Sequence, residues 1–227
     1  MERHFQKELE SLKTSLIKMG SVVEENIAMA IRSVMENNQS LALKVIESDT
    51  RVDALEIEID NAIVDLLALQ QPVASDLRFI LAALKINNDL ERIGDHAVNI
   101  AQAAQVLSSL PNVELLDEIP TMVEITRTML KDAIDSFILL DPAKARIVLK
   151  TDDQIDDLNR TVIQKVIALL KSNKQTAECG LEVSLVSRNL ERVADLATNI
   201  AEEVIFHTQA RVVKHHADEK ESPAAQT

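Results

Sequence analysis

Apolar residues recur at steps of three and four along most of this chain, which places them on one face of an α-helix. The first such stretch covers about residues 3–36. Its apolar positions are Leu9, Leu12, Leu16, Met19, Val23, Ile27, Ala30, Ile31 and Val34. Asn37 and Asn38 interrupt the pattern and can cap the helix that follows. The pattern therefore predicts one long amphipathic helix with a defined end.

Two further helices are predicted before the middle of the chain. The second covers about residues 39–69 and is stopped by Pro72, because the residue before a proline disfavours helical geometry. The third is expected to be capped near Ser75 and to continue to about Leu107. The first half thus reads as three helices joined by short turns.

The second half repeats the first. Residues 88–101 (NDLERIGDHAVNIA) return as residues 188–201 (RNLERVADLATNIA), one hundred positions later. Earlier positions correspond at a shift of 103, and Asn38 maps onto Asp141, which precedes Pro142 in an N-cap followed by an N1 proline. Agreement at a fixed shift indicates an internal structural repeat.

The predicted fold is all-α, with two tandem pseudo-symmetric antiparallel three-helix bundles. The first bundle is assigned to residues 1–110 and the second to 111–212, with the proline-containing stretch 108–120 between them. Residues 213–227 form a polar tail that we expect to be disordered. Aromatic residues make up only 2 % of the chain, and three Gly among 227 residues leave few turn signals, which also favours helices over sheets.

Charge and cysteine content narrow the class of protein. A net charge of −13 repels a phosphate backbone, so we expect no nucleic-acid partner. Cys179 is the only cysteine and cannot form an internal disulfide. We find neither a signal segment nor an apolar run long enough for a membrane span, and predict a protein that is cytoplasmic and not membrane-embedded.

Four acid pairs with i, i+4 spacing lie on helix faces. They are Asp49 with Asp53, Glu91 with Asp95, Asp152 with Asp156, and Glu191 with Asp195. In a helical hairpin, two residues at the same level are equally far in sequence from the turn. If the first pair lies opposite the second, the turn is at Pro72. If the third pair lies opposite the fourth, the turn is between Asn173 and Lys174. Each half is therefore expected to bring four carboxylates to one level of two neighbouring helices.

Such carboxylates repel one another unless their pKa values rise, arginines pair with them, or cations bind. One interpretation is that they are solvated helix faces with Arg92 and Arg192 as counter-charges. The other is a cation site. Oxygen ligands without His or Cys suit hard cations such as Mg²⁺, Mn²⁺, Ca²⁺ or iron, and not a structural zinc.

Catalysis has no support in the sequence, and we predict that the protein is not an enzyme. No histidine stands three residues after a Glu, as di-iron bundle oxidases require. A metal-dependent hydrolase or oxidase would need an acid or base beside an open metal position, and the sequence shows no histidine placed for that role. A coiled-coil scaffold would need a narrower apolar stripe than these helices have. His96 points away from Asp95 and is interpreted as a surface or interface residue, while Gly94 indicates a close approach to its helix face.

The run QQPVASDLRFILAALKINNDLERIGDHAVNIA (70–101) and its echo NLERVADLATNIAE (189–202) closely resemble the PhoU family. The resemblance covers nearly the whole chain apart from the tail. It implies two three-helix bundles with multinuclear metal clusters, of iron or zinc and in some members Mn²⁺ or Mg²⁺, on E/D-x-x-x-D motifs. The residues at those motif positions are Asp49, Asp53, Glu91, Asp95, Asp152, Asp156, Glu191 and Asp195.

The resemblance also implies a function. It points to a negative regulator of the bacterial phosphate-starvation response and of phosphate uptake, acting as a homodimeric adaptor between the ATPase subunit of a phosphate ABC transporter and a sensor histidine kinase. The second copy departs from the first, because Gly-Asp-His becomes Ala-Asp-Leu at residues 194–196 and the run at 72–78 has no counterpart. We therefore expect the second metal site to be weaker or differently filled.

Overall fold

The computed structural model describes residues 2–72, 74–110, 115–172 and 177–210. These residues form six helices and no strand. The helices are α1 (Glu2–Met35), α2 (Gln39–Gln70), α3 (Ala74–Ser109), α4 (Glu118–Leu139), α5 (Pro142–Ser172) and α6 (Ala177–Gln209). The predicted all-α fold is confirmed, and the polar tail at 213–227 lies outside the described residues.

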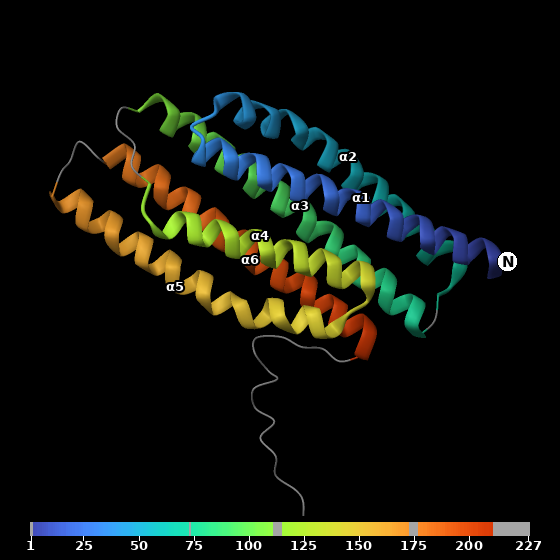
Figure 1. Ribbon diagram of the computed structural model, residues 1–227. Helices are drawn as coiled ribbons and strands as arrows, with labels where there is room; N and C mark the ends of the chain where they lie inside the picture. Colours follow the sequence, from blue (N-terminus) through green and yellow to red (C-terminus); the bar gives the residue numbers. More distant parts are fainter. Residues whose placement is uncertain (1, 73, 111–114, 173–176, 211–227) are drawn as a thin grey trace, which may run out of the picture.

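The helices lie side by side in an elongated array, with α2 and α5 at its outer edges (Figure 1). Within each half every helix packs against the other two, so each half is a three-helix bundle. The bundles meet mainly where α3 packs along α6, and α1 also contacts α4. The buried apolar side chains form a continuous core across both halves. Two bundles thus share one hydrophobic interior.

The central helices α3 and α6 carry small residues where they bury the most surface. In α3 these include Ala97, Ala101 and Ala104, and in α6 Ala194, Ala197 and Ala201, all 2 % exposed or less. Small side chains allow helix axes to approach closely. Helices α3 and α6 are buried on more than one side, because each packs against its own bundle and against the other.

The repeat extends to individual hydrogen bonds at the first turn of each half. Ser33 and Ser136 are both fully buried and donate their hydroxyl groups to Ala30 O and Ala133 O. Just after these serines, where α1 and α4 end, Asn37 (φ 52°) and Leu140 (φ 52°) adopt the left-handed conformation. This conformation is favourable for Asn but costly for Leu, so the second half keeps the backbone of the first at some expense.

Helix starts follow the predicted caps with two exceptions. Asp141 Oδ1 accepts hydrogen bonds from Ala143 N (2.9 Å) and Lys144 N (3.1 Å), as an N-cap before Pro142 should. Asn38 caps α2 through a bond from Leu41 N at 3.2 Å. The expected cap near Ser75 is wrong, because α3 begins at Ala74.

The second exception concerns the connection between the halves. The predicted boundary of 108–120 is too long, since Pro120 lies in the first turn of α4. Proline is tolerated there because the first turn needs no backbone N–H partner within the helix. The predicted second turn, between Asn173 and Lys174, falls outside the described residues.

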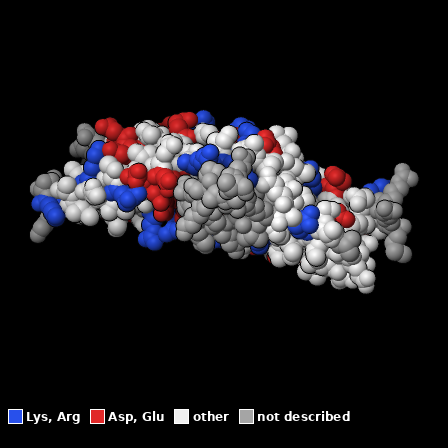
Figure 2. All heavy atoms as spheres, turned by 90° about the horizontal axis from the view of Figure 1, so that it is seen from below, with Lys and Arg blue, Asp and Glu red and all other residues white. Residues whose placement is uncertain are grey.

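Surface charge is mixed. Figure 2 shows one long face on which Asp and Glu side chains lie interspersed with Lys and Arg side chains. Within the described part of the chain, no helix has both the length and the apolar character that a bilayer span requires.

Replacing the N-cap of α5 tests the cap directly. Asp141→Ala should lower the free energy of unfolding by about 1 kcal/mol, because two backbone N–H groups lose their acceptor. Urea unfolding monitored by circular dichroism measures the change. Asp153→Ala, at an exposed position within α5, removes the same charge and should cost less than half as much. Equal losses in both variants would show that the cap contributes nothing specific.

Candidate metal centre

The first acid cluster spans α2 and α3, as the hairpin register predicts. Asp49 and Asp53 lie on α2, and Glu91 and Asp95 on α3. Burial raises the pKa of Asp49 and of Glu91, and the charges of Asp53 and Asp95 raise both further. The side chains of Asp49 and Glu91 are partly buried, and those of Asp53 and Asp95 are exposed. No three of these four described carboxylates bring ligand oxygens within 4.8 Å of one another, so their role as metal ligands stays a prediction.

Burial and the repulsion of neighbouring acids raise the pKa of two members of this cluster, Glu91 and Asp49. Burial raises the pKa of Glu91 to about 6, and Asp95 and then Glu56 add to the effect. Burial is also the main cause for Asp49, followed by Asp53 and Asp95. Among the described residues, neither Lys nor Arg forms an ion pair with any of these carboxylates. The first cluster is an uncompensated concentration of negative charge.

Glu56 is a member of this cluster that the sequence analysis missed. Burial raises its pKa, followed by the charges of Asp60, Asp53 and Asp95. Glu56 and Asp60 continue the stripe of Asp49 and Asp53, at steps of three and four along α2. The predicted acid pairs were those that occur in both halves. Glu56 and Asp60 are not repeated in this way, because the second half has Asn159 and Ile163 at the corresponding positions.

Neutral side chains fix the α2–α3 contact next to the acids. Asn87 of α3 is buried and donates to Asp60 Oδ1 (2.9 Å) and to Glu56 O (3.1 Å). In the second half Ser187 donates to Asn159 Oδ1 at 2.7 Å. The side chain that accepts the hydrogen bond is thus an acid, Asp60, in the first half and an amide, Asn159, in the second.

The close approach expected at Gly94 is present. A Cβ added at Gly94 would meet Val52 Cγ1 at 3.2 Å, which is tighter than an ordinary van der Waals contact. Val52 lies between Asp49 and Asp53 in sequence, and Gly94 directly precedes Asp95. The glycine therefore lets α3 approach α2 at the level where the four carboxylates face one another.

The second acid cluster is tighter than the first. One carboxylate oxygen from each of Asp156, Glu191 and Asp195 lies within 4.8 Å of the other two. This is the only such group of potential metal ligands that the described residues contain. Asp152, the fourth predicted member, is partly buried on α5 but does not belong to this group. Three of four predicted residues converge in the second half.

An arginine enters the second cluster. Arg192 Nη1 donates to Asp195 Oδ2 at 2.8 Å, and Nε lies 3.5 Å from Glu191 Oε2. Burial raises the pKa of Asp195 and of Glu191, and Arg192 lowers both. Arg192 is therefore the counter-charge that the solvated-face interpretation expects.

Arg92, the counterpart in the first half, behaves differently. Its nearest carboxylate is Asp89, at 3.8 Å, and not Asp95. The expectation that Arg92 neutralises the first acid cluster is thus not met, while the same expectation for Arg192 is. Both halves carry an arginine at this position, but Arg92 lies nearest to Asp89, whereas Arg192 pairs with Asp195.

Both clusters offer oxygen ligands only. Carboxylates at this density can hold hard cations such as Mg²⁺, Mn²⁺, Ca²⁺ or iron, whose charge offsets the repulsion. His96, the histidine beside Asp95, forms a hydrogen bond from Nδ1 to Asn189 Oδ1 (2.8 Å) on α6. It is an interface residue, as its direction on the helix indicated.

The charge of Glu91 should weaken the metal-free protein in a pH-dependent way. Because folding raises the pKa of Glu91, the folded state loses stability as pH rises through the range from 4.5 to about 6. Glu91→Gln should therefore raise Tm at pH 8, by about 2–4 °C for each 1 kcal/mol gained, and leave Tm unchanged at pH 4. Calorimetry with chelator present measures this. Glu58→Gln, on the exposed side of α2, serves as the control and should change neither value.

Comparison with known proteins places the chain in a family. The sequence matches the PhoU domain twice, over residues 16–104 and 119–204. It is 37 % identical over 215 residues to the phosphate-specific transport system accessory protein PhoU homolog of Aquifex aeolicus, covering 94 % of this chain and 97 % of the relative.

Solved structures agree in fold. The crystal structure of PhoU from Pseudomonas aeruginosa has a TM-score of 0.89 at 31 % identity, covering 91 % of this chain and all of that one. The phosphate transport system regulatory protein PhoU from Streptococcus pneumoniae has a TM-score of 0.86 at 28 % identity, covering 93 % of this chain and all of that one. With two family domains in sequence and six superposable helices, the chain belongs to the PhoU family.

Proposed function

We propose that this protein is a metal-binding negative regulator of phosphate uptake and of the phosphate-starvation response. The observation that carries the proposal is the duplication of facing acid pairs. In the first half, burial and neighbouring acids raise the pKa of Asp49 on α2 and of Glu91 on α3. In the second half, ligand oxygens of Asp156 on α5 and of Glu191 and Asp195 on α6 lie within 4.8 Å of one another. Relatives named phosphate-specific transport system accessory proteins support the physiological setting.

The metal would be held by the eight predicted carboxylates, with Glu56 added in the first half. Bound cations would supply positive charge where the first cluster has none and where the second has only Arg192. They would link α2 to α3 and α5 to α6, so metal occupancy would stiffen each bundle. The family resemblance favours multinuclear iron or zinc, and the oxygen-only donor set also suits Mn²⁺ or Mg²⁺.

The role in signalling would be that of a cytoplasmic adaptor rather than a catalyst. The metal-ligand group of the second half contains neither histidine nor cysteine. His96 is engaged with Asn189 through Nδ1. A hydrolase or oxidase would need a proton-transfer group beside the metal, so no feature favours that class. Partners would be the ATPase subunit of a phosphate transporter and a sensor histidine kinase, contacted by a homodimer.

Metal content tests the proposal. Protein purified without chelator should contain several metal equivalents by mass spectrometry of the elements. A variant with Asp49, Asp53, Glu91 and Asp95 changed to Asn or Gln should lose the first-half share, because the ligands keep their shape but lose their charge. A control that changes the exposed Glu47, Glu58 and Asp153 in the same way should keep its metal.

Metal-free wild-type protein with normal helicity would contradict the metal-binding part of the proposal. The regulatory part has a separate readout. Changing Glu91 and Asp95 together to Ala should derepress phosphate-starvation genes in cells grown with ample phosphate. Normal repression together with normal metal content would show that this cluster has no function.

Replacing Arg192 should strengthen metal binding, whereas replacing the carboxylates should weaken it. Its guanidinium competes with cations for Asp195 and Glu191, so Arg192→Gln should raise the Mn²⁺ affinity of the second half by a few-fold, up to about tenfold. Isothermal titration in a buffer free of phosphate measures the affinity. Arg127→Gln, which removes an exposed arginine of α4 paired with Glu124, should leave it unchanged. A weaker affinity in the Arg192 variant would mean that the arginine supports the site.

A further inference from the structure

Two grooves run along the junction of α3 and α6, and the repeat relates them. The first is lined at six corresponding positions by Lys85, Asn88, Asp89, Asn199, Glu202 and Glu203. The second is lined by Leu185, Arg188, Asn189, Asn99, Gln102 and Ala103, which are the same positions exchanged between the halves at a shift of 100. One backbone arrangement thus carries two different sets of side chains.

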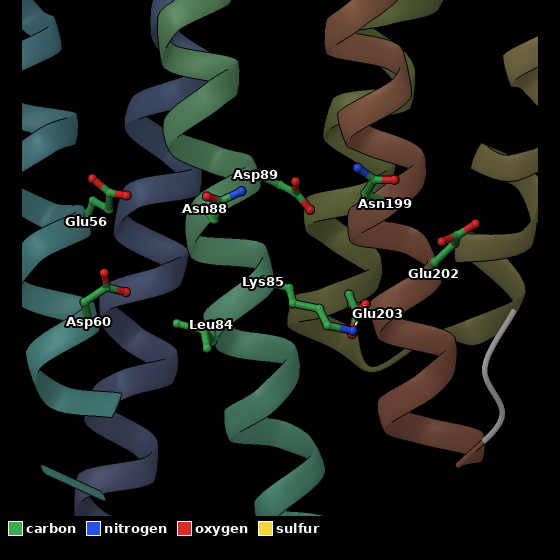
Figure 3. Close-up of a pocket in the computed structure, with 9 residues that line it drawn as sticks. All are labelled: Glu56, Asp60, Leu84, Lys85, Asn88, Asp89, Asn199, Glu202 and Glu203. Carbon is green, nitrogen blue, oxygen red and sulfur yellow. Dashed lines mark hydrogen bonds and ion pairs between the residues drawn. The ribbon is translucent and has the colours of Figure 1, made fainter. Parts of the chain in front are cut away.

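The first groove has an ion pair across it and an excess of acids along its lining. Figure 3 shows Lys85 of α3 and Glu203 of α6 directed at each other, with Nζ 2.6 Å from Oε1. Asp89 points toward Asn199, and burial raises the pKa of Asp89 to about 6. Glu56 and Asp60 add further acids from α2, so this groove of about 490 Å³ is acidic.

The second groove has lost that ion pair. Leu185 stands where Lys85 does, and Ala103 stands where Glu203 does. The smaller and neutral side chains leave a space of about 700 Å³, which is larger than the first groove. Neutral polar groups, from Asn99, Gln102 and the buried Asn189, remain along it.

Three arginines converge on the second groove in a protein of net charge −13. Arg92 comes from α3, and Arg188 and Arg192 come from α6. The only carboxylate among the lining residues is Glu182. His96 lines the same groove.

Two of the three arginines are weakly committed to partners inside the protein. Arg188 is exposed and forms no ion pair with any described residue. Arg192 pairs with Asp195 within one helix while its side chain stays 46 % exposed, and an exposed pair of this kind is worth about 1 kcal/mol or less. Arg92 differs, because it lies 3.8 Å from the buried Asp89. Reorientation toward a ligand is therefore inexpensive for Arg188 and Arg192.

His96 and Asn189, which also line the groove, are held in place by hydrogen bonds. Asn189 Nδ2 donates to Leu185 O at 2.7 Å, which leaves Asn189 Oδ1 to accept from His96 Nδ1 at 2.8 Å. This bond joins α3 to α6. The groove therefore combines fixed neutral polar groups with exposed guanidinium groups.

We propose that the groove lined by Arg92, Arg188 and Arg192 binds a phosphate-class oxyanion, either inorganic phosphate or the phosphoryl group of a small organic phosphate. Guanidinium groups donate two parallel hydrogen bonds to such oxygens, which lysine cannot do in the same geometry. The groove measures about 700 Å³, which is a volume typical of small-molecule sites, so ADP is included among the probes. This site goes beyond the proposed metal-dependent regulation, since it binds an anion through guanidinium groups, and it shares only Arg192 with the second acid cluster.

Isothermal titration of the full chain with inorganic phosphate, pyrophosphate and ADP tests the proposal. The protein is first treated with chelator, and ionic strength is kept low, because exposed charges are screened at high salt. At least one probe should bind with a Kd of about 1 mM or lower. A stronger signal from inorganic phosphate or from ADP identifies the source of the phosphoryl group.

The decisive variant exchanges one repeat residue for its counterpart. Arg188→Asn gives the second groove the residue that Asn88 provides in the first, and should weaken binding about tenfold. Arg127→Asn removes an exposed arginine elsewhere and should change Kd by less than about twofold. Thermal unfolding of both variants should match the wild type, because both side chains are exposed.

Two results would overturn the oxyanion site. One is the absence of binding by all three probes up to about 10 mM. The other is an equal loss of affinity in the Arg188 and Arg127 variants, which would indicate general charge attraction. These titrations use metal-free protein, so phosphate binding is scored separately from the metal content of protein purified without chelator. Phosphate binding by a protein that holds no metal would refute the metal proposal alone. Metal binding by a protein that binds none of the three probes would refute the oxyanion site alone.

Discussion

The packing of α3 against α6 is the constraint on which the other features depend. These two helices carry the repeated Leu-Glu-Arg motif and lie in the middle of the array (Figure 1), and alanines are among the buried residues of both. Each helix presents its acid pair to its own bundle and its other side to the partner helix. Separating α3 from α6 would expose a core shared by both halves and would dismantle both grooves.

Local sequence patterns predicted what local physics determines. Apolar spacing gave the six helices, and side-chain chemistry gave the caps at Asn38 and Asp141. The hairpin register then placed Asp49 and Asp53 opposite Glu91 and Asp95, because the position of a turn fixes which residues share a level. These inferences needed contacts only within one bundle.

Features formed between the bundles were not predictable in the same way. No spacing in the sequence reports which sides of α3 and α6 meet, so the pairing of His96 with Asn189 and of Lys85 with Glu203 had no signal. Glu56 was missed for another reason. It has no acidic counterpart in the second half, and a search for matched pairs discards residues that the two copies do not share.

The differences between the copies carry as much meaning as their agreement. The backbone is duplicated down to the buried Ser33 and Ser136, yet the charges it carries have diverged. In the first half the acids gather without a counter-charge, and in the second an arginine enters the acid cluster.

The same divergence separates the grooves. One is closed by Lys85 and Glu203, while the other replaces that pair with Leu185 and Ala103 and gathers arginines instead. A buried junction tolerates such exchanges only if charge remains balanced or reaches solvent. In the first groove Lys85 offsets Glu203, and burial raises the pKa of Asp89 to about 6, which lowers the negative charge there. The second groove satisfies the condition through exposed guanidinium groups, which leaves hydrogen-bonding capacity available to a ligand.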